Sequence, residues 1–542
     1  MWTRTNLVDY LLLAFFGIHL LSISWSQNNA EAIFSTMRLG LFVILYFFFK
    51  WLFNYHKEQA VTAITRSVCA LGLTLGILAG HQLYLVFLDV GFDRFTVAPV
   101  TGLSGNKNIL SGTLFMLLPF LLLGAYRSEK KIRWLYILTI LLLTYILWQL
   151  RTRSILIATL VFSIMALLCY WYGAYKNKFA KTVLIAIPSI SVVLFFMLFF
   201  LGYLSEVSEF LQLKAGSKTG TLAERFVIWE KSIELYKQHP FLGVGSGNWK
   251  IAFPEVGLEG LSRAEQTTTF FARPHNDWIQ ILCETGIIGG LLWISIWISL
   301  FWKNSVILGS SIIQKQVIQR SLILAGSIGF AVFSAFSYPL ERIEFIILLA
   351  LYIAFLNHRL TSKNKSKKIH THRIFLITTI AFLGIASVYG FLRIQREYFI
   401  NAIKDKTVKN QQIFNSDYYH PTIYSITPIG IPVKYYEGIS YLQTADYNSA
   451  IKAFQEALLI APNDLPTHLN IGVSYFRSDQ TEKALYHYHT ALKISPKHQN
   501  VLFNTAALYY KLRDKQKALE YLNKVQDDYP RKKEFLEAVY QL

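Results

Sequence analysis

The chain has 542 residues, 53% of them hydrophobic and 15% aromatic, with a formal net charge of +20. Its apolar residues fall in blocks close to the roughly 20 residues with which a helix crosses a bilayer, which excludes an ordinary soluble protein. In a soluble protein, a positive charge of this size would suggest binding to nucleic acid. Here the positive residues lie in the loops between the apolar blocks, so we exclude nucleic acid as a partner.

The first elements along the chain are eleven predicted membrane spans, the tenth of them short. We place them at residues 8–25, 39–53, 68–88, 109–126, 134–150, 154–172, 183–204, 278–302, 321–338, 345–356 and 374–392. Residues 1–392 are therefore expected to form an all-α, polytopic membrane bundle of about 11 to 12 spans.

Loops rich in lysine and arginine alternate along the chain with loops that have few, so most of the positive residues lie on one side of the membrane. That side includes Lys50, Lys57, residues 127–133 and residues 303–320. The positive-inside rule makes it the cytoplasm. The odd number of spans then places the long loop 205–274 and the C-terminus outside the cytoplasm.

Within that loop, residues 221–239 have apolar side chains at near-helical spacing, and Pro240 follows as a stop. We expect a helix lying on the membrane or against the bundle.

The loop ends in Arg273-Pro274-His275-Asn276-Asp277-Trp278, which leads directly into a span that carries Glu284. Ionisable groups at the mouth of a membrane helix are costly, so a functional site is the first hypothesis. Asp277, Gln280 and Glu284 share one helix stripe, and the positive helix end favours a neutral His275 that could act as a base. Glu284 needs a partner, for which Arg151 or Arg153 is the expected choice.

The same outer side collects further polar residues: Asn106, Asn108, Arg151, Arg153 and Arg225. Arginines beside a histidine suit a phosphate-bearing lipid better than acyl transfer, because guanidinium groups match phosphate oxygens. Structural alternatives remain open for each group. In these alternatives His275 is interfacial and Asp277 is a helix cap. The arginines snorkel or are solvated, and residues 104–108 form a turn and a helix cap.

No metal or cofactor site is expected. The cysteines Cys69, Cys169 and Cys283 lie in predicted spans without ligand spacing, and Asp-x-Asp is absent. The segment Gly243-Val244-Gly245-Ser246-Gly247 imitates a nucleotide loop, but no strand precedes it, so we reject that interpretation.

After a linker at 393–431, the sequence repeats with a period of 34. Tyrosine, alanine and proline recur at Tyr441, Tyr475, Tyr509, Ala450, Ala484, Ala518, Pro462, Pro496 and Pro530. This pattern resembles the tetratricopeptide repeat and predicts an α-solenoid of three repeats over 432–542, with a capping helix at 532–542. Such a surface binds a protein partner, or serves as a spacer.

Several motifs between 102 and 300 together resemble the O-antigen ligase and polymerase superfamily of membrane glycosyltransferases. They are Gly105-Asn106-Lys107-Asn108, Thr152-Arg153-Ser154, Arg225 with Trp229, Pro240 to Gly245, and His275-Asn276-Asp277 with Glu284-Thr285-Gly286. The resemblance implies a metal-independent enzyme of the bacterial inner membrane that uses an undecaprenyl-diphosphate-linked glycan. It implies that His275 activates the acceptor hydroxyl and that Arg153 and Arg225 hold the diphosphate. Thr152 stands where many members have serine, and Arg151 is an alternative arginine.

The resulting hypothesis is a ligase that moves a glycan to a hydroxyl of lipid A core or of a protein, with the repeats on the periplasmic side. The alternatives are an O-antigen or capsule polymerase and a protein O-oligosaccharyltransferase. From other classes, a lipid or glycan transporter would need charges through the membrane midplane, and a membrane scaffold would use only the repeats.

Overall fold

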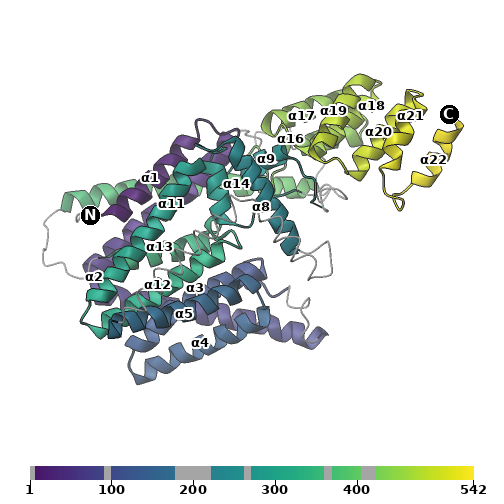
Figure 1. Cartoon of the computed structure of the whole chain (residues 1–542). Helices are drawn as coiled ribbons and strands as arrows, with labels where there is room; N and C mark the ends of the chain where they lie inside the picture. Colours follow the sequence, from purple (N-terminus) through teal and green to yellow (C-terminus); the bar gives the residue numbers. More distant parts are fainter. Residues whose placement is uncertain (1–5, 91–98, 177–220, 262–269, 359–368, 405–422) are drawn as a thin grey trace.

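A computed structural model of the chain describes residues 6–90, 99–176, 221–261, 270–358, 369–404 and 423–542. These residues form an all-helical bundle followed by a separate stack of short helices, in agreement with the predicted fold class (Figure 1). Among them, β-type pairing is limited to an isolated antiparallel bridge between Ile426 and Pro432.

The bundle is built from long helices, the short helix α9 and two short 3-10 turns. In chain order they are α1 (Leu7–Ser22), α2 (Asn29–Val90), α3 (Lys107–Arg127), α4 (Lys130–Leu150), α5 (Arg153–Tyr175), α8 (Thr221–Gln238), α9 (Trp249–Ala252), η1 (Phe253–Val256), α11 (Asp277–Ser310), α12 (Gln314–Ser334), η2 (Pro339–Glu341), α13 (Ile343–Asn357) and α14 (Ile369–Lys404).

Six of these helices are long and apolar enough to cross a bilayer, and α1 and α13 are shorter apolar helices. The expected spans at 39–53 and 68–88 lie in one element, α2, whose backbone breaks at Lys57 with φ 43°. The expected span at 183–204 lies outside the described residues. The count of about 11 to 12 spans is therefore not confirmed.

Helix α4 presents an apolar face to the outside of the bundle. Trp134, Leu138, Leu141, Tyr145 and Trp148 are spaced alternately by four and three residues, and each is more than half exposed. A stripe of this size would be unfavourable in water, whereas hydrocarbon solvates it. This helix therefore lies at the lipid-facing edge of the bundle.

One end of the bundle holds a buried polar group that we call the Asp9 cluster: Asp9, Tyr46, Lys50, Lys303 and Asn357. The Lys50 ammonium lies 2.5 Å from the Asp9 carboxylate, and the Lys303 ammonium donates to the Asn357 side chain at 2.6 Å. Tyr46 donates to Asp9. Lys50 and Lys303 were both expected on the cytoplasmic side, and the fold brings them to the same end.

The opposite ends of α1, α2 and α13 meet the long loop. Helix α8 agrees with the helix predicted over 221–239, and its buried face includes Phe226, Trp229, Ile233 and Leu235. It packs against α11, so the loop helix covers one end of the bundle.

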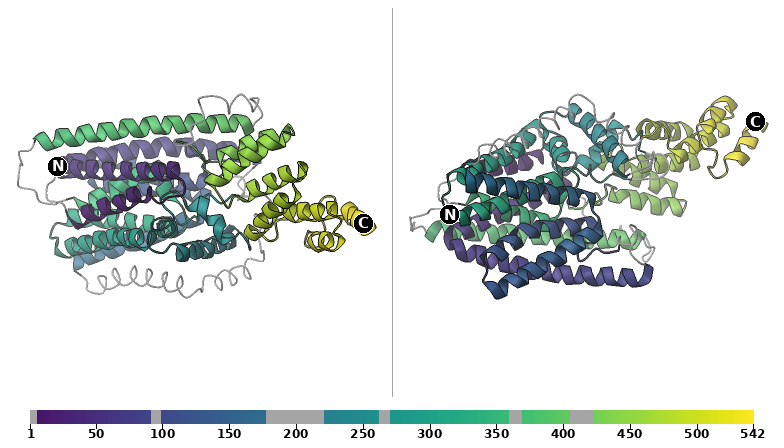
Figure 2. Two further views of the ribbon diagram at one scale, coloured as in Figure 1. Left: turned by 90° about the horizontal axis from the view of Figure 1, so that it is seen from above. Right: turned by 60° about the horizontal axis from the view of Figure 1, so that its bottom comes forward.

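The C-terminal stack confirms the predicted repeats. Its helices are α16 (Val433–Gln443), α17 (Tyr447–Ile460), α18 (Leu465–Arg477), α19 (Thr481–Ile494), α20 (Gln499–Lys511), α21 (Lys515–Asn523) and α22 (Lys532–Gln541). Successive helices pack in antiparallel pairs, as the last part of the chain shows in Figure 2, and α22 occupies the position predicted for the cap.

The stack is attached directly to the long loop. The Leu258 amide donates to the carbonyl of Ile494 in α19 at 2.6 Å, and both regions contribute to one apolar cluster. A second attachment joins α2, the loop and α14, because the buried Glu31 carboxylate accepts from Lys250 at 2.8 Å and from Arg393 at 2.6 Å. Helix α14 also continues to Lys404, beyond the expected end of the last span.

Candidate active site

The segment before α11 is fixed from two directions. The Trp229 indole of α8 donates to the Pro274 carbonyl at 2.7 Å. Asn276 is the N-cap of α11, and its side chain accepts from the Trp278 and Ile279 amides at 3.0 and 3.2 Å. Between these anchors His275 has a positive φ of 56°, an unusual backbone conformation for a residue with a side chain. The position of the histidine is thus imposed by its neighbours.

Three cationic or titratable side chains reach the segment from Phe336 to Tyr338. The Arg273 guanidinium lies 4.2 Å from the centre of the Tyr338 ring, and the His275 ring approaches it edge-on at 5.1 Å. Arg225 donates to the carbonyl of Phe336, two residues before Tyr338, at 3.1 Å. The fold therefore brings Arg225 and His275 together, although they are 50 residues apart in the sequence.

We call Arg225, Arg273, His275, Tyr338 and Glu341 the His275 cluster. Arg273 forms an ion pair of 3.0 Å with Glu341. Burial alone would raise the pKa of Glu341, but Arg273 and Arg38 lower it, so the carboxylate is held ionised. Burial lowers the pKa of Arg225, although an arginine stays protonated at neutral pH. Within the described residues no carboxylate pairs with Arg225.

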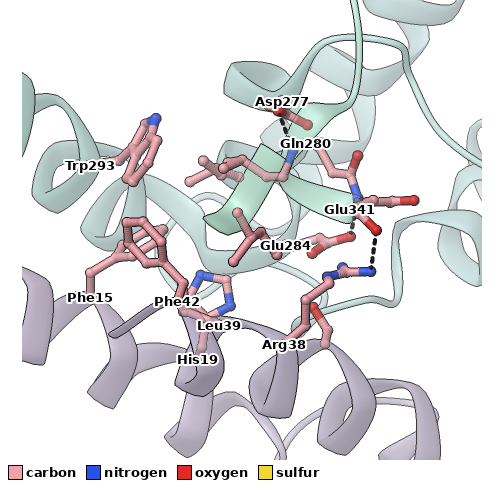
Figure 3. A pocket seen from close by; sticks show the side chains of 14 residues that line it. Phe15, His19, Arg38, Leu39, Phe42, Asp277, Gln280, Glu284, Trp293 and Glu341 are labelled. Atoms are coloured by element: carbon pink, nitrogen blue, oxygen red, sulfur yellow. Dashed lines mark hydrogen bonds between the residues drawn. The ribbon is translucent and has the colours of Figure 1, made fainter. Parts of the chain in front are cut away.

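The stripe on α11 points into the protein beside this cluster, as Figure 3 shows for Asp277, Gln280 and Glu284. Asp277 accepts from the Leu340 amide at 3.0 Å and so holds η2 against α11. Gln280 donates to Glu284 at 3.0 Å and to Glu341 at 2.7 Å. The stripe thus connects the buried part of α11 to the His275 cluster.

The predicted partner of Glu284 is wrong. Its carboxylate accepts from the Gly247 amide at 2.8 Å and from Gln280, rather than from Arg151 or Arg153. The reason is that both of those arginines are exposed at the junction of α4 and α5, whereas the loop after α8 inserts beside Glu284. A backbone amide satisfies a buried carboxylate without bringing a second charge into the bundle.

The glycine-rich motif at residues 243–247 binds, through its backbone, to α11 at the motif Glu284-Thr285-Gly286. Helix α11 breaks at Gly286, with φ 62°, and the carbonyls of Cys283 and Glu284 accept from the Val244 and Gly245 amides, each at 2.9 Å. A Cβ on Gly286 would lie 2.2 Å from the Phe241 carbonyl oxygen. The glycine-rich loop therefore satisfies the backbone of a broken membrane helix, as irregular backbone at this depth requires.

The other predicted residues gather at the start of α3 and α5. Asn106 caps α3, and Asn108 accepts from Thr152 at 3.4 Å. Arg151, in the left-handed conformation, ends α4, and Arg153 begins α5, which has no side-chain cap. Asn106 thus has the capping role considered as an alternative, and Asn108 lies beside the arginine pair.

Packing of α5 on α12 places this junction on the same side of the bundle as His275. The Ala158 carbonyl lies close to Gly329, so the start of α5 approaches the end of α12, and Phe336 follows just beyond. Asn108, Arg153 and Arg225 consequently share one side. No contact between Arg153 and Arg225 occurs in the described ranges.

Sequence reasoning missed Arg38, Tyr338 and Glu341 as members of the site, and it named Arg273 without assigning it a role. Arg38 donates to the Glu341 carbonyl at 3.4 Å. A usable signal existed, because Tyr338, Glu341 and Arg342 crowd a short connection between two apolar spans. For metals, the described residues contain no group of three or more His, Cys, Asp or Glu placed to hold an ion, so independence from metal stays a prediction.

The fold and the site define a polytopic helical membrane protein with a cationic, histidine-containing site at one end of its bundle. Residues 137–294 match the O-antigen ligase family, and residues 432–464 and 500–531 match tetratricopeptide repeats. A comparison with curated proteins finds no match. A region of less than a third of the chain thus matches the O-antigen ligase family, and the part that follows it contains tetratricopeptide repeats. The domain supports a membrane glycosyltransferase-like function and contains Arg151, Arg153, Arg225 and His275.

Proposed function

We propose that the protein transfers a glycan from undecaprenyl diphosphate to a hydroxyl of an acceptor at the outer face of the cytoplasmic membrane, without a metal ion. The observation that carries this proposal is that Arg225 and His275, both within the residues that match the O-antigen ligase family, reach the same short segment: Arg225 donates to the Phe336 carbonyl, and His275 packs on Tyr338. A phosphate ligand and a proton acceptor are the two groups that such a transfer needs.

Arg225 is the group best suited to the donor diphosphate. It is partly buried, and one of its nitrogens is fixed on the Phe336 carbonyl, so the guanidinium is oriented before the donor binds. Arg273 is less suited because Glu341 already neutralises it. Arg153 is the second proposed ligand, with Arg151 as the alternative, because the uncapped start of α5 offers backbone amides and a positive helix end to an anion.

His275 is proposed as the base. In the transfer, the acceptor oxygen forms a bond to the anomeric carbon while the bond from that carbon to the diphosphate oxygen breaks. The hydroxyl proton passes to His275, and the bond's electron pair leaves with the diphosphate, whose charge the arginines stabilise. A single displacement of this kind inverts the anomeric configuration. The cleaved diphosphate bond supplies the driving force, because ATP is not available outside the cytoplasm.

Supporting residues hold this geometry. Asn276 caps the helix that follows His275, and Asp277 fixes η2, which carries Glu341. Glu284 fastens the glycine-rich loop through the Gly247 amide. Asn108 lies beside the arginine pair through Thr152. Loss of these contacts would displace the reacting groups, and a displacement of 1 Å can cost about 100-fold in rate.

The repeats favour a bulky acceptor, such as lipid A core or a protein, over the identical lipid-linked units that a polymerase joins. Their attachment to the loop that covers the site supports this, because an acceptor held by the stack would be near His275. Removal of residues 438–542 would expose the apolar surface shared by the loop and the stack. A cleaner test is substitution of exposed groups on the stack, such as Tyr486→Ala, with transfer to protein and lipid acceptors measured separately.

A transporter or a scaffold is the rival from another class. The Asp9 cluster and the His275 cluster lie at opposite ends of α1, of α13 and of the part of α2 before its break at Lys57, whereas a transport path needs charged groups near the midplane. Purified full-length protein should convert a lipid-linked oligosaccharide and an acceptor into the joined product. Absence of product with every acceptor class, in protein that is folded, would contradict the enzyme and favour the rivals.

A further inference from the structure

The Tyr338 ring is in contact with both the Arg273 guanidinium and the His275 ring. The guanidinium carbon lies 4.2 Å from the centre of the Tyr338 ring, and the centres of the Tyr338 and His275 rings are 5.1 Å apart, with their planes at 67°. The second contact is an edge-to-face arrangement, which aromatic rings prefer to face-to-face stacking. Tyr338 therefore joins a fixed cation to the histidine that is proposed as the base.

Arg273 is itself held in place. One of its terminal nitrogens lies 3.0 Å from a carboxylate oxygen of Glu341, and the other oxygen of that carboxylate accepts from Gln280 at 2.7 Å (Figure 3). Gln280 belongs to α11, so the ion pair is tied to the helix that begins just after His275. A guanidinium is attracted to the face of an aromatic ring, and the fixed Arg273 therefore restrains the Tyr338 ring.

The backbone of Tyr338 is aligned with that of His275 by a single hydrogen bond. Asp277, two residues after His275, accepts from the amide of Leu340, two residues after Tyr338, at 3.0 Å. The Tyr338 carbonyl also accepts from the Glu341 amide at 3.2 Å, which closes the turn at η2. The two segments are thus fixed relative to each other close to the point where the rings meet.

The His275 imidazole needs a neighbour of this kind because its own covalent geometry does not fix it. The positive φ sets the direction in which the side chain leaves the backbone. The second side-chain torsion of a histidine has broad energy minima, so the surrounding groups decide how the ring is turned. A general base must bring a ring nitrogen to within about 2.6–3.2 Å of the oxygen whose proton it takes. Rotation of the imidazole would therefore misplace the base even if the backbone stayed in position.

The ring of Tyr338, rather than its hydroxyl, makes these contacts. In the part of the chain that the structure describes, no group forms a hydrogen bond with the Tyr338 hydroxyl. A phenylalanine ring could meet His275 in the same edge-to-face manner, whereas an aliphatic side chain offers neither an edge nor a face. Substitution by phenylalanine and by an aliphatic residue consequently separates the ring from the hydroxyl.

We propose that Tyr338 is a positioning residue for the base: its ring, restrained by Arg273, keeps the His275 imidazole turned toward the acceptor hydroxyl. Tyr338 then contributes to the rate of transfer through His275 and leaves the binding of the donor to the arginines. This assignment rests on the proposed function, in which His275 takes the proton.

Transfer kinetics on the purified full-length protein test the role of the ring. Tyr338→Leu removes the ring, Tyr338→Phe keeps it, and Tyr338→Met is a second variant without a ring, whose flexible side chain adapts to irregular gaps. Tyr540→Leu is the matched control, because Tyr540 is exposed on α22 in the repeat stack. Thermal unfolding of each variant establishes that folded proteins are compared.

Tyr338→Leu and Tyr338→Met should lower kcat by about 10-fold to 100-fold, the effect of a misplaced catalytic group, with KM for the donor within twofold of wild type. Tyr338→Phe should transfer at least fivefold faster than Tyr338→Leu, and Tyr540→Leu should match wild type. The proposal is overturned if a folded variant without the ring keeps kcat within twofold of wild type, or if its loss lies in KM for the donor. It is also overturned if Tyr338→Phe loses as much as Tyr338→Leu, because the hydroxyl would then be the group that is used.

The double variant His275→Ala, Tyr338→Leu decides whether Tyr338 acts through His275. Once the imidazole is removed, the ring has nothing to orient, so the double variant should transfer within twofold of His275→Ala. If Tyr338→Leu lowers the residual transfer of His275→Ala by its full factor, the ring acts independently of His275 and the proposal fails.

The same variants separate this proposal from the proposed function. Loss of transfer in His275→Ala with wild-type kcat in Tyr338→Leu would refute the positioning role and leave the base assignment standing. Wild-type transfer by the His275→Ala variant would refute the base assignment, and the positioning role with it.

Discussion

The two buried polar clusters at opposite ends of the bundle differ in how completely they are paired. In the Asp9 cluster, Asp9 binds Lys50 and Tyr46, and Asn357 binds both Asp9 and Lys303. None of these side chains has a buried atom without a partner. Near His275, by contrast, Asn276, Gln280 and His19 keep unpaired buried atoms, and Arg225 has no carboxylate in the described part of the chain.

This difference indicates that the Asp9 cluster has a structural role and the His275 cluster a functional one. A polar network that satisfies itself has nothing left for a ligand, and its role is to hold helices together. A network with spare donors and acceptors lowers stability unless a ligand completes it. Substitutions in the Asp9 cluster should therefore affect stability, and those of Arg225 and His275, the members of the His275 cluster that are proposed to act on the substrate, should affect catalysis.

The largest effect is expected for His275→Ala, which removes the proposed base. Transfer should fall by about 100-fold to 10,000-fold, the usual contribution of general base catalysis. The amount of protein in the membrane should stay unchanged, because the His275 ring is only partly buried. Product formation by membranes of cells lacking the wild-type enzyme measures this, with His239→Ala as the matched control. If His275→Ala transferred the glycan at the wild-type rate, His275 would not be the base.

The second effect concerns stability. Asp9→Asn leaves the Lys50 ammonium buried without its counter-charge and should destabilise the protein by about 3–5 kcal/mol. Thermal unfolding of purified protein is the measurement. The double variant Asp9→Leu, Lys50→Met should be less destabilised than Asp9→Asn, and both should retain kcat at temperatures where they are folded. A loss of kcat in folded protein would mean that the Asp9 cluster is also functional.

A smaller effect is expected for the arginines. Arg225→Lys keeps the charge but loses the planar fork, and kcat/KM for the donor should fall by about 10-fold to 100-fold, as for loss of a charge-assisted hydrogen bond. Comparison of Arg151→Gln with Arg153→Gln then identifies the second ligand. If both variants were as active as wild type, neither arginine would bind the diphosphate, and the diphosphate site would be restricted to the His275 cluster.

The smallest effect is a change in pH dependence. The pKa of Glu341 is lowered in the folded protein from its usual 4.5, chiefly because Arg273 and Arg38 outweigh burial. Its ionised form therefore stabilises the fold above about pH 4.5, and this contribution is lost as the pH falls through the lower folded pKa. Glu341→Gln should flatten the loss of thermal stability below pH 4.5. An unchanged profile would show that the ion pair with Arg273 does not stabilise the fold.

Much of the fold could be predicted from the sequence because its signals are local. The 34-residue period gave the repeats and the cap, and the near-helical spacing over 221–239 gave α8. The break of α2 at Lys57 was less accessible, because a polar stretch between two spans does not say whether the helix continues through it. The start of α14 and its extension to Lys404 were hidden for the same reason.

The site was predicted in part. The His275 stretch was recognised because ionisable groups at a span are costly. Arg225 was counted among the polar residues of the same outer side, and the family resemblance implied its role. The partner of Glu284 was mispredicted because a backbone amide leaves no sign in the residue types. Tyr338 and Glu341 were missed because their role depends on η2 folding back to Asp277 through a single backbone hydrogen bond.

The central claim is that Arg225 holds the donor diphosphate while His275 performs the proton transfer, and it is tested most directly by measuring donor binding and single-turnover transfer on the same purified variants. His275→Ala should bind a labelled undecaprenyl-diphosphate glycan as wild type does and fail to transfer it, whereas Arg225→Ala should bind it at least tenfold more weakly. Wild-type transfer by His275→Ala, or wild-type donor affinity in Arg225→Ala, would contradict the account.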